Sequence, residues 1–428
     1  MSTYPRPAAS GTASNPAPID PARIPIRVVE LDLDTQKLTP EPRRGESVLA
    51  LVRLHRRPIG VVHATAGKVP AETLSAFARQ ELAEEIASHL AADGVVEPRD
   101  RTCAQLRTRT LADPPSLSVI VATRERPATL GRCLDSLLAL DYPDVEVVVV
   151  DNAPATSATA ELVHARRDDR VEYAVEPRHG LANARNRGLS ASTGELVAFT
   201  GDDAVVDRDW ATALAEAFAA VPRAGCVTGL IMPAELETRP QVLLERRGAF
   251  PGGFRLAEHH VDDPAAHPFF PLAAARLGSG ANMAFRARSL RALGGFDGAL
   301  GTGTPARGGD DLLAFFRTAV SGHSLVYQPA AVVWRHHRRE PQALSKQAFG
   351  YGVGLGAYLT ATVAREPRTA LSLLHRLPAG AAHALRESRR DAADPAAWPA
   401  RLARLERYGL LCGPFAYAHS RWRGAARG

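Results

Sequence analysis

Two aspartates, Asp202 and Asp203, stand side by side where a buried strand is expected to end. The apolar-leaning run 195–199 leads into Thr200-Gly201, and the two acids follow at once. Neighbouring carboxylates repel each other, so something of opposite charge should compensate for them. A turn with an Asx cap would explain the pair without any chemistry. With a divalent cation between them, however, the same oxygens could hold an anionic ligand.

Polar residues also end two other expected strands. The stretch 116–127 runs into a loop that carries Thr123 and Arg126, and the Val-rich run 145–154 reaches Asp151. Strand, helix and strand at this spacing predict a βαβ unit, in which a continuous Val run is typical of a buried parallel strand. Ligands of such sheets bind at the carboxyl ends of the strands. Thr123, Arg126, Asp151 and the aspartate pair are therefore expected on one rim.

A second acidic pair, Asp310-Asp311, follows the glycine-rich loop 298–309 and begins a helix. A helix N-terminus favours acids through its dipole, so this pair has a structural explanation as well as a chemical one. The next strand ends at Arg335-His336-His337. Carboxylate and imidazole ligands together suit Mn²⁺ or Mg²⁺ with open coordination positions.

An alternating α/β frame must bring these residues together. Expected helices follow the expected strands in turn, which predicts a doubly wound α/β domain. A small α+β module precedes it, with strands at 24–33 and 48–64 and a helix at 71–94, and nothing in that module resembles a site. The expected boundaries are a disordered tail at 1–21, the α+β module at 22–98, a linker at 99–115, the α/β domain at 116–343 and a helical region at 344–428.

The composition is ordinary for a globular protein, with 45% hydrophobic and 23% charged residues over 428 positions. The net charge is +6, and almost all of the positive charge is carried by arginine. We attribute this preference for arginine to coding bias and not to nucleic-acid binding. The four cysteines are far apart and show no metal-ligand spacing, so incidental thiols in a reduced cytoplasmic protein are expected. No run of 18 apolar residues occurs, which argues against a membrane span.

A series of motifs resembles family 2 glycosyltransferases of the GT-A fold. The motifs stand in the family's order and spacing over 116–340: SVIVATRERP, EVVVVDNAP, GLANARNRGL, FTGDD, GSGANMAF, GGFD, GGDDLLAFFR and YQPAAVVWRHHRR. The resemblance implies an inverting, metal-assisted transfer of a sugar from a nucleotide-diphosphate sugar, such as a UDP- or dTDP-sugar, to an acceptor hydroxyl. It covers a little over half of the chain.

The resemblance also implies a role for each matching residue. Thr123 and Arg126 would line the nucleotide pocket, Asp151 would bind the base, Arg185 would approach the nucleotide from the facing helix, and Asp202 would contact the ribose. Asp203 would ligate Mn²⁺ or Mg²⁺, together with His336 or His337. Asp311 would be the catalytic base, with Asp310 and Asn282 on the acceptor side.

Two departures from the family's pattern bear on these roles. Gly201 stands where relatives often carry a further acid, so one charge is missing near the metal. Relatives commonly read His-x-His, whereas this chain has adjacent histidines at 336 and 337, which leaves open which of them binds the metal. A nucleotide-sugar-binding scaffold without catalysis is the alternative function, and a nucleotidyltransferase is a further one with less support.

The segment 344–377 has two interpretations. Glycines alternate with Tyr, Val and Leu between 350 and 356, which suits close helix packing. A helical hairpin that covers the catalytic domain is one interpretation. An interfacial contact with the inner membrane face, near a lipid-linked acceptor, is the other.

Overall fold

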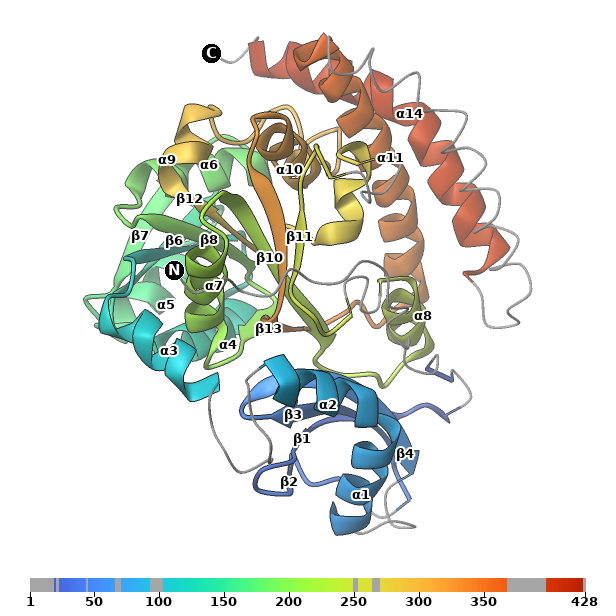
Figure 1. The fold of residues 1–428 in the computed structure, drawn as a ribbon. Coiled ribbons are helices and arrows are strands. Elements are labelled where there is room, and N and C mark those ends of the chain that lie inside the picture. The colour runs from blue at the N-terminus through green and yellow to red at the C-terminus, as the bar shows by residue number, and fades with distance from the viewer. Residues whose placement is uncertain are drawn as a thin grey trace.

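The computed structural model describes residues 19–20, 23–43, 45–65, 71–92, 103–248, 253–263, 270–367 and 398–425. Figure 1 shows three regions: an N-terminal module, a central domain built on a large sheet, and two long helices near the C-terminus. The expected tail at 1–21 lies almost entirely outside the described residues, as do residues 368–377 of the C-terminal segment.

The N-terminal module is a four-stranded sheet with helices on one face. The strand order is β2-β1-β3-β4. One face of the sheet packs on α1 and α2 through residues such as Leu74 and Leu82. The other face shares a core with the central domain, where Leu49 and Leu51 lie among Leu230 and Met232. The elements are β1 (Ile26–Asp32), β2 (Lys37–Thr39), β3 (Ser47–Leu54), β4 (Arg57–Thr65), α1 (Ala71–Glu81) and α2 (Ala83–Ala92).

The expected linker contains a helix, α3 (Cys103–Ala112). Arg107 of this helix forms ion pairs of 2.6 Å with Asp141 and 2.5 Å with Asp209, both in the central domain. The polar composition of 99–115 predicted a linker, but the charged side chain of Arg107 joins α3 to the central domain. The connection from the module to the central domain is therefore packed along this helix.

The central sheet has the order β11-β13-β10-β12-β8-β5-β6-β7, and β9 pairs with β13 beside this path. Strands β5, β6, β7 and β8 are parallel neighbours, while β12 runs antiparallel to both β8 and β10. The Val-rich β6 is buried on both faces, as its sequence predicted. The strands are β5 (Leu117–Thr123), β6 (Val145–Asn152), β7 (Val171–Glu176), β8 (Leu196–Gly201), β9 (Ala204–Val206), β10 (Ala224–Pro233), β11 (Ala257–His259), β12 (Asn282–Arg286) and β13 (Ser324–Arg335).

Helices cover both faces of this sheet and form two cores. One core lies under α4 and α7, around Leu134 and Trp210. The other lies under α6 and α10, where Phe199, Phe285 and Phe296 pack edge to face. The helices are α4 (Pro127–Leu138), α5 (Ala158–Arg166), α6 (Leu181–Ala191), α7 (Trp210–Ala220), α8 (Arg239–Gly248), α9 (Ala287–Ala292) and α10 (Asp310–Val320), with the 3₁₀ segment η2 (Leu272–Leu277).

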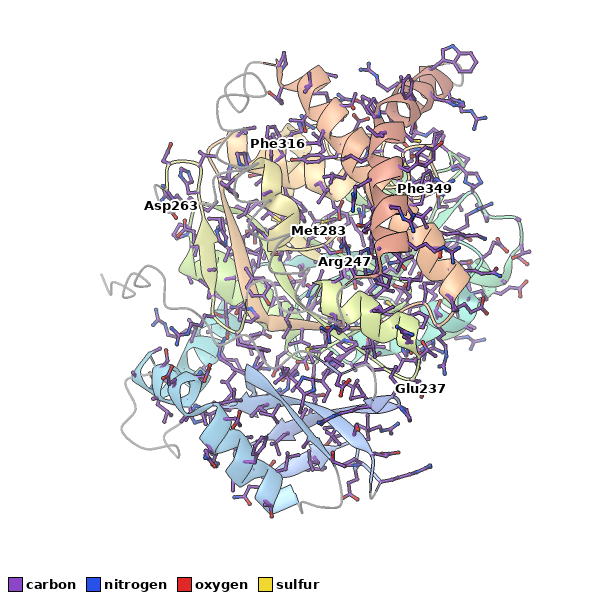
Figure 2. The ribbon with its side chains drawn as sticks, turned by 90° about the vertical axis from the view of Figure 1, so that its right-hand side faces the viewer. Glu237, Arg247, Asp263, Met283, Phe316 and Phe349 are labelled. Atoms are coloured by element: carbon purple, nitrogen blue, oxygen red, sulfur yellow. The ribbon has the colours of Figure 1, made fainter. Side chains whose placement is uncertain are left out.

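Two long helices, α11 (Pro341–Arg365) and α14 (Ala400–Ala425), lie side by side against the central domain (Figures 1 and 2). Glycines allow their backbones to approach closely. A Cβ atom at Gly352 would lie 1.9 Å from the Glu406 carbonyl oxygen, and one at Gly356 would lie 2.3 Å from that of Leu410. Gly352 and Gly356 of the alternating glycines therefore serve the packing of α11 on α14, while Gly354 lies against Gly308.

The expected architecture is confirmed: an α/β central domain, a small α+β module and a helical C-terminal region. Within the described part of the chain, no helix combines the length and the apolar character needed to cross a bilayer.

Candidate active site

Asp202 and Asp203 form the turn between β8 and β9, at the carboxyl end of the parallel strands. Thr123 donates a hydrogen bond of 2.8 Å to Oδ2 of Asp202. Arg126 donates one of 3.2 Å to Oδ1. Burial raises the pKa of Asp202, while Arg126 and Thr123 oppose that rise. The strand ends thus meet as the sequence predicted, and the β5 loop supplies the positive charge that the aspartate pair needs.

Asp203 faces the end of β13. Arg335 and Ala204 pair across the β9–β13 ladder, which brings Nε of Arg335 to 3.5 Å from Oδ1 of Asp203. The backbone N–H of His336 donates to the Asp203 carbonyl at 3.2 Å. Asp203 raises the pKa of Arg335, because a nearby negative charge stabilises the guanidinium. Nothing in the sequence predicted this ion pair.

Gly201 lies against the side chain of Asp203. A Cβ atom at position 201 would lie 2.7 Å from Oδ1 of Asp203. Any side chain there would force the Asp203 carboxylate to move, and a carboxylate would also repel it. The carboxylate of Asp203 therefore folds back over Gly201, the position at which the family's pattern often has a further acid.

The two histidines lie in different surroundings. His337 places Nε2 3.0 Å from Oε2 of Glu245 on α8. His336 follows β13 beside Asp203, and its half-buried imidazole has no hydrogen-bond partner among the described residues. This difference favours His336 over His337 as the metal ligand.

Asp151 is the penultimate residue of β6 and is fully buried. Its Oδ2 accepts a hydrogen bond of 3.0 Å from Tyr173, while its Oδ1 has no partner. Burial raises the pKa of Asp151. A buried oxygen without a partner is costly, and a donor from a bound ligand would relieve that cost. The sequence did not predict that Tyr173 of β7 contacts Asp151, because it did not show which strand lies beside β6.

The second acidic pair divides into a buried member and a half-buried one. Asp310 is 3% exposed and accepts a 2.5 Å hydrogen bond from Arg185 of α6. Burial raises the pKa of Asp310, and the Arg185 guanidinium opposes that rise. Arg185 also donates to the Gly280 carbonyl at 2.6 Å. The structure thus places Arg185 against Asp310 and Gly280.

Asp311 is fixed on two sides. Gly280 donates its N–H to Oδ2 at 2.8 Å, and the backbone N–H of Leu312 donates to Oδ1 at 2.9 Å. Gly309 precedes the pair with a φ of 87°, a conformation that glycine adopts without strain. The carboxylate therefore stands at the N-terminus of α10, with a backbone N–H donating to each of its oxygens.

The structure places Asn282, expected on the acceptor side, inside the core of the domain. Asn282 is fully buried and accepts a 2.9 Å hydrogen bond from the Trp210 indole. Its amide nitrogen donates to the carbonyls of Leu230 at 2.9 Å and Ala331 at 2.8 Å. These bonds satisfy the amide inside the core, so Asn282 joins β12 to its neighbours.

Residues 118–284 match the family described as glycosyl transferase family 2. This region contains the Asp202-Asp203 turn and the strands that position it. The central domain is a family 2 glycosyltransferase domain. The glycosyltransferase domain thus holds Thr123, Arg126, Asp151, Arg185, Asp202 and Asp203 within the matched residues, whereas Asp310, Asp311, His336 and His337 lie beyond them.

Curated relatives resemble parts of the chain. A pre-mycofactocin glycosyltransferase of Mycobacterium tuberculosis is 28% identical over 278 residues, which cover 61% of this chain and 54% of that protein. A glucosyl-dolichyl phosphate glucuronosyltransferase of Haloferax volcanii is 29% identical over 132 residues, which cover 30% of this chain and 42% of that protein. The matches therefore span about half or less of these relatives.

Among solved structures, a mannosyltransferase from Pyrobaculum calidifontis in complex with GDP-Man and Mn²⁺ aligns with 72% of this chain and 92% of that one. Its sequence identity to this chain is 21% and the TM-score is 0.47.

Proposed function

We propose that the chain transfers a sugar from a nucleotide-diphosphate sugar to an acceptor hydroxyl, with inversion at the anomeric carbon. The observation that carries the proposal is the Asp202-Asp203 turn at the carboxyl end of β8, held by Thr123 and Arg126 from β5 and the loop that follows it, inside a family 2 glycosyltransferase domain. A UDP- or dTDP-sugar is the proposed donor. The acceptor is of unknown identity.

The nucleotide would lie across the ends of β5, β6 and β8. The unpartnered Oδ1 of Asp151 can accept a hydrogen bond from a base N–H group. Asp202 can accept hydrogen bonds from ribose hydroxyls, and Arg126, 41% exposed, carries a positive charge suited to the donor's phosphates. The site therefore offers acceptors to the nucleoside and a cation to the diphosphate.

Asp203 and His336 fit a divalent cation, Mn²⁺ or Mg²⁺. Nε of Arg335 lies 3.5 Å from Oδ1 of Asp203, and the imidazole of His336 has no hydrogen-bond partner among the described residues. Carboxylate oxygen and imidazole are ligands that Mn²⁺ accepts, and the diphosphate supplies further oxygens. When bound, the cation would neutralise charge on the departing nucleoside diphosphate.

Asp311 is the proposed general base. An ionised carboxylate at the N-terminus of α10 can take the proton from the acceptor hydroxyl while that oxygen attacks the anomeric carbon. Attack from the side opposite the leaving diphosphate inverts the configuration. Arg185 pairs with Asp310, the residue next to Asp311 in α10. It also donates to the carbonyl of Gly280, whose own N–H hydrogen-bonds Asp311.

Release of nucleoside diphosphate from UDP-, dTDP- and GDP-sugars in the presence of Mn²⁺ tests the function. The proposal predicts release that depends on one donor, on the cation and on an added acceptor preparation. Nucleotide binding without release for every donor would instead support the scaffold alternative.

Replacing His336 by alanine should weaken nucleotide binding in Mn²⁺ by at least about tenfold, since one metal ligand is lost. The matched variant His337→Ala should leave that affinity unchanged, because His337 pairs with Glu245. Calorimetric titration of the nucleotide with and without Mn²⁺ measures both. Equal losses in the two variants would contradict the assignment of His336.

We also propose contact with an anionic membrane surface, which the exposed apolar residues of the C-terminal helices support. Those on α11 recur every four residues, and those on α14 accompany arginines such as Arg404 and Arg421. The exposed large hydrophobic residues of the two helices are Tyr351, Leu355, Leu359, Val363, Tyr408, Leu410, Leu411, Phe415 and Trp422. Such a surface suits an interfacial rather than a spanning contact.

The membrane contact predicts that the protein sediments with vesicles containing anionic lipid, and that Phe415→Ser with Trp422→Ser reduces this binding. These side chains are 79% and 70% exposed, so their replacement should leave the fold intact. Protein that stays in the supernatant at low ionic strength would argue against the contact. We propose a cytoplasmic location, with this contact on the inner membrane face.

A further inference from the structure

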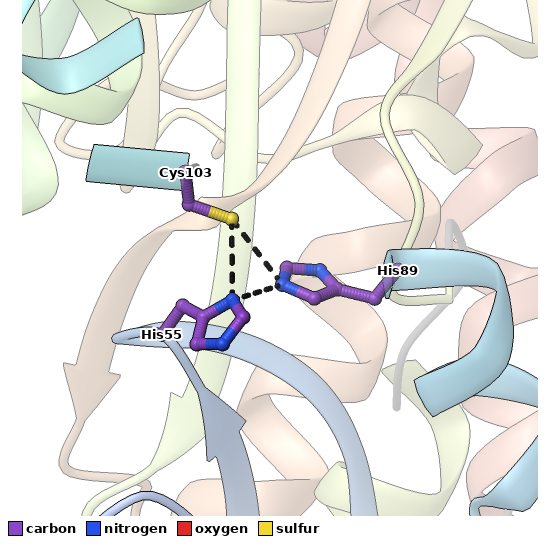
Figure 3. A group of neighbouring side chains, drawn as sticks. All are labelled: His55, His89 and Cys103. Atoms are coloured by element: carbon purple, nitrogen blue, oxygen red, sulfur yellow. Dashed lines mark hydrogen bonds between the residues drawn. The ribbon is translucent and has the colours of Figure 1, made fainter. Parts of the chain in front are cut away.

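Three metal-ligating side chains converge outside the glycosyltransferase site. They are His55, from the turn between β3 and β4, His89, from α2, and Cys103, the first residue of α3 (Figure 3). Nδ1 of His55 lies 3.4 Å from Nε2 of His89. Sγ of Cys103 lies 3.3 Å from Nε2 of His89 and 3.8 Å from Nδ1 of His55. This is the one group of three or more His, Cys, Asp or Glu ligand atoms found in the described part of the chain.

These separations match those of a tetrahedral zinc site. With Zn–N bonds of about 2.0–2.1 Å and a Zn–S bond of about 2.3 Å, tetrahedral angles place two nitrogens about 3.3–3.4 Å apart and sulfur about 3.6 Å from nitrogen. The observed values of 3.4, 3.3 and 3.8 Å scatter around those separations. An N···N separation of 3.4 Å is long for a hydrogen bond, whose usual length is about 2.9–3.0 Å.

The surroundings of the cluster also resemble those of a metal centre. The His55 side chain is 2% exposed and Cys103 is 7% exposed. Asp34 accepts the backbone N–H of His55 at 2.7 Å and places Oδ1 3.9 Å from Nε2, the ring nitrogen that faces away from the cluster. Ligating histidines commonly direct their second ring nitrogen at a carboxylate, which fixes the tautomer and the ring orientation.

The β3–β4 turn that carries His55 has an unusual backbone. His55 and Arg56 have φ angles of 52° and 68°, where a two-residue hairpin turn normally selects Asn or Gly. Arg56 in turn pairs with Asp209 at 2.7 Å. The turn therefore presents His55 to the cluster and Arg56 to the central domain at the same time.

We infer that His55, His89 and Cys103 bind a Zn²⁺ ion that fastens the N-terminal module to the glycosyltransferase domain. Nitrogen and thiolate ligands select borderline-soft metals such as Zn²⁺ over Mg²⁺ or Mn²⁺. Cys103 binds as the thiolate, and its thiol proton passes to the solvent. A water completes the four-coordinate shell.

The position of the cluster explains what the metal would do. It joins the β3–β4 turn and α2 of the module to the first turn of α3, whose Arg107 reaches Asp209. Asp209 directly precedes α7 and receives both Arg56 and Arg107. Zinc would thus hold together the β3–β4 turn and α3, whose arginines Arg56 and Arg107 both form ion pairs with Asp209.

Metal analysis of the full-length protein tests the inference. Purified wild-type protein should carry about one zinc per chain after dialysis against metal-free buffer, and Co²⁺ should replace it with a thiolate-to-metal charge-transfer absorption. Cys103→Ser and His89→Gln should lose the zinc and the absorption. The matched controls Cys412→Ser and Asp203→Asn should retain both, since neither residue belongs to the cluster.

A measurement on the unaltered chain keeps the inference testable if those variants fail to fold. Adding Zn²⁺ to chelator-treated protein should raise its unfolding temperature by at least about 5 °C and protect one buried thiol from alkylation. Wild-type protein that carries no zinc, gives no cobalt–thiolate absorption and shows no thermal shift would overturn the inference. Zinc retained by Cys103→Ser would overturn it as well.

Discussion

Replacing Asp311 with asparagine is expected to lower the rate of sugar transfer by about 10²–10⁴-fold, the usual contribution of a general base. Asparagine keeps an oxygen that can accept the N–H of Gly280 or of Leu312, so the local backbone should persist. Nucleotide affinity should stay within about twofold of the wild type, because Asp311 is not among the residues assigned to the nucleotide or the cation. Steady-state kinetics and nucleotide titration measure the two effects separately.

The matched control is Asp168→Asn. Asp168 is an aspartate paired with Arg170 at 2.8 Å, and its pKa is lowered to about 2, chiefly by hydrogen bonds with Arg170. It lies before β7, at the opposite end of that strand from the site. This variant should transfer sugar at the wild-type rate. Unchanged turnover in Asp311→Asn would show that another group accepts the proton.

Replacing Arg185 with methionine is expected to reduce the free energy of unfolding by about 3–5 kcal/mol, the largest stability loss we predict. The change leaves the Asp310 carboxylate buried without its partner and removes the donor to the Gly280 carbonyl. It also removes the guanidinium that lies 5.4 Å from the Phe296 ring centre. Urea unfolding at neutral pH measures the loss.

Two further variants separate the buried charge from simple loss of packing. The double variant Arg185→Met with Asp310→Leu should recover most of the stability, since no unpaired charge remains buried. Arg170→Met should cost no more than about 1 kcal/mol, because its ion pair with Asp168 lies at the surface. A double variant as unstable as the single one would contradict the explanation.

The single variant Arg185→Met should also depend on pH. Burial raises the folded-state pKa of Asp310 even beside Arg185, and loss of the guanidinium removes the charge that opposes that rise. Between the unfolded and folded pKa values the native state binds more protons, so stability falls as pH rises through that window. The deficit relative to the double variant should therefore shrink on acidification.

The sequence predicted the strand ends well because parallel strands share one edge. Buried Val-rich runs, each followed by polar residues, placed Thr123, Arg126 and Asp202 on one rim, where they form direct hydrogen bonds. The same logic could not resolve His336 from His337. That distinction depends on Glu245, which α8 brings to His337 from far along the chain.

Two other features could not be predicted from the sequence, because they depend on contacts between side chains that are far apart along the chain. Asn282 stands in a motif that suggests a ligand contact, yet Trp210, Leu230 and Ala331 satisfy its amide in the core. Cys103 has no neighbouring cysteine or histidine at a metal-ligand spacing. His55 and His89 reach it only because the hairpin, α2 and α3 meet at one corner.

The most direct test of the account is thermal unfolding of the purified protein with UDP, dTDP or GDP, each with and without Mn²⁺. A ligand at a hundred times its dissociation constant adds about 2.7 kcal/mol of stability, which is readily measured. The account predicts a shift with one of these nucleotides that requires the cation and is lost in Asp203→Asn. No shift with any nucleotide, with or without Mn²⁺, would contradict a nucleotide site at the Asp202-Asp203 turn.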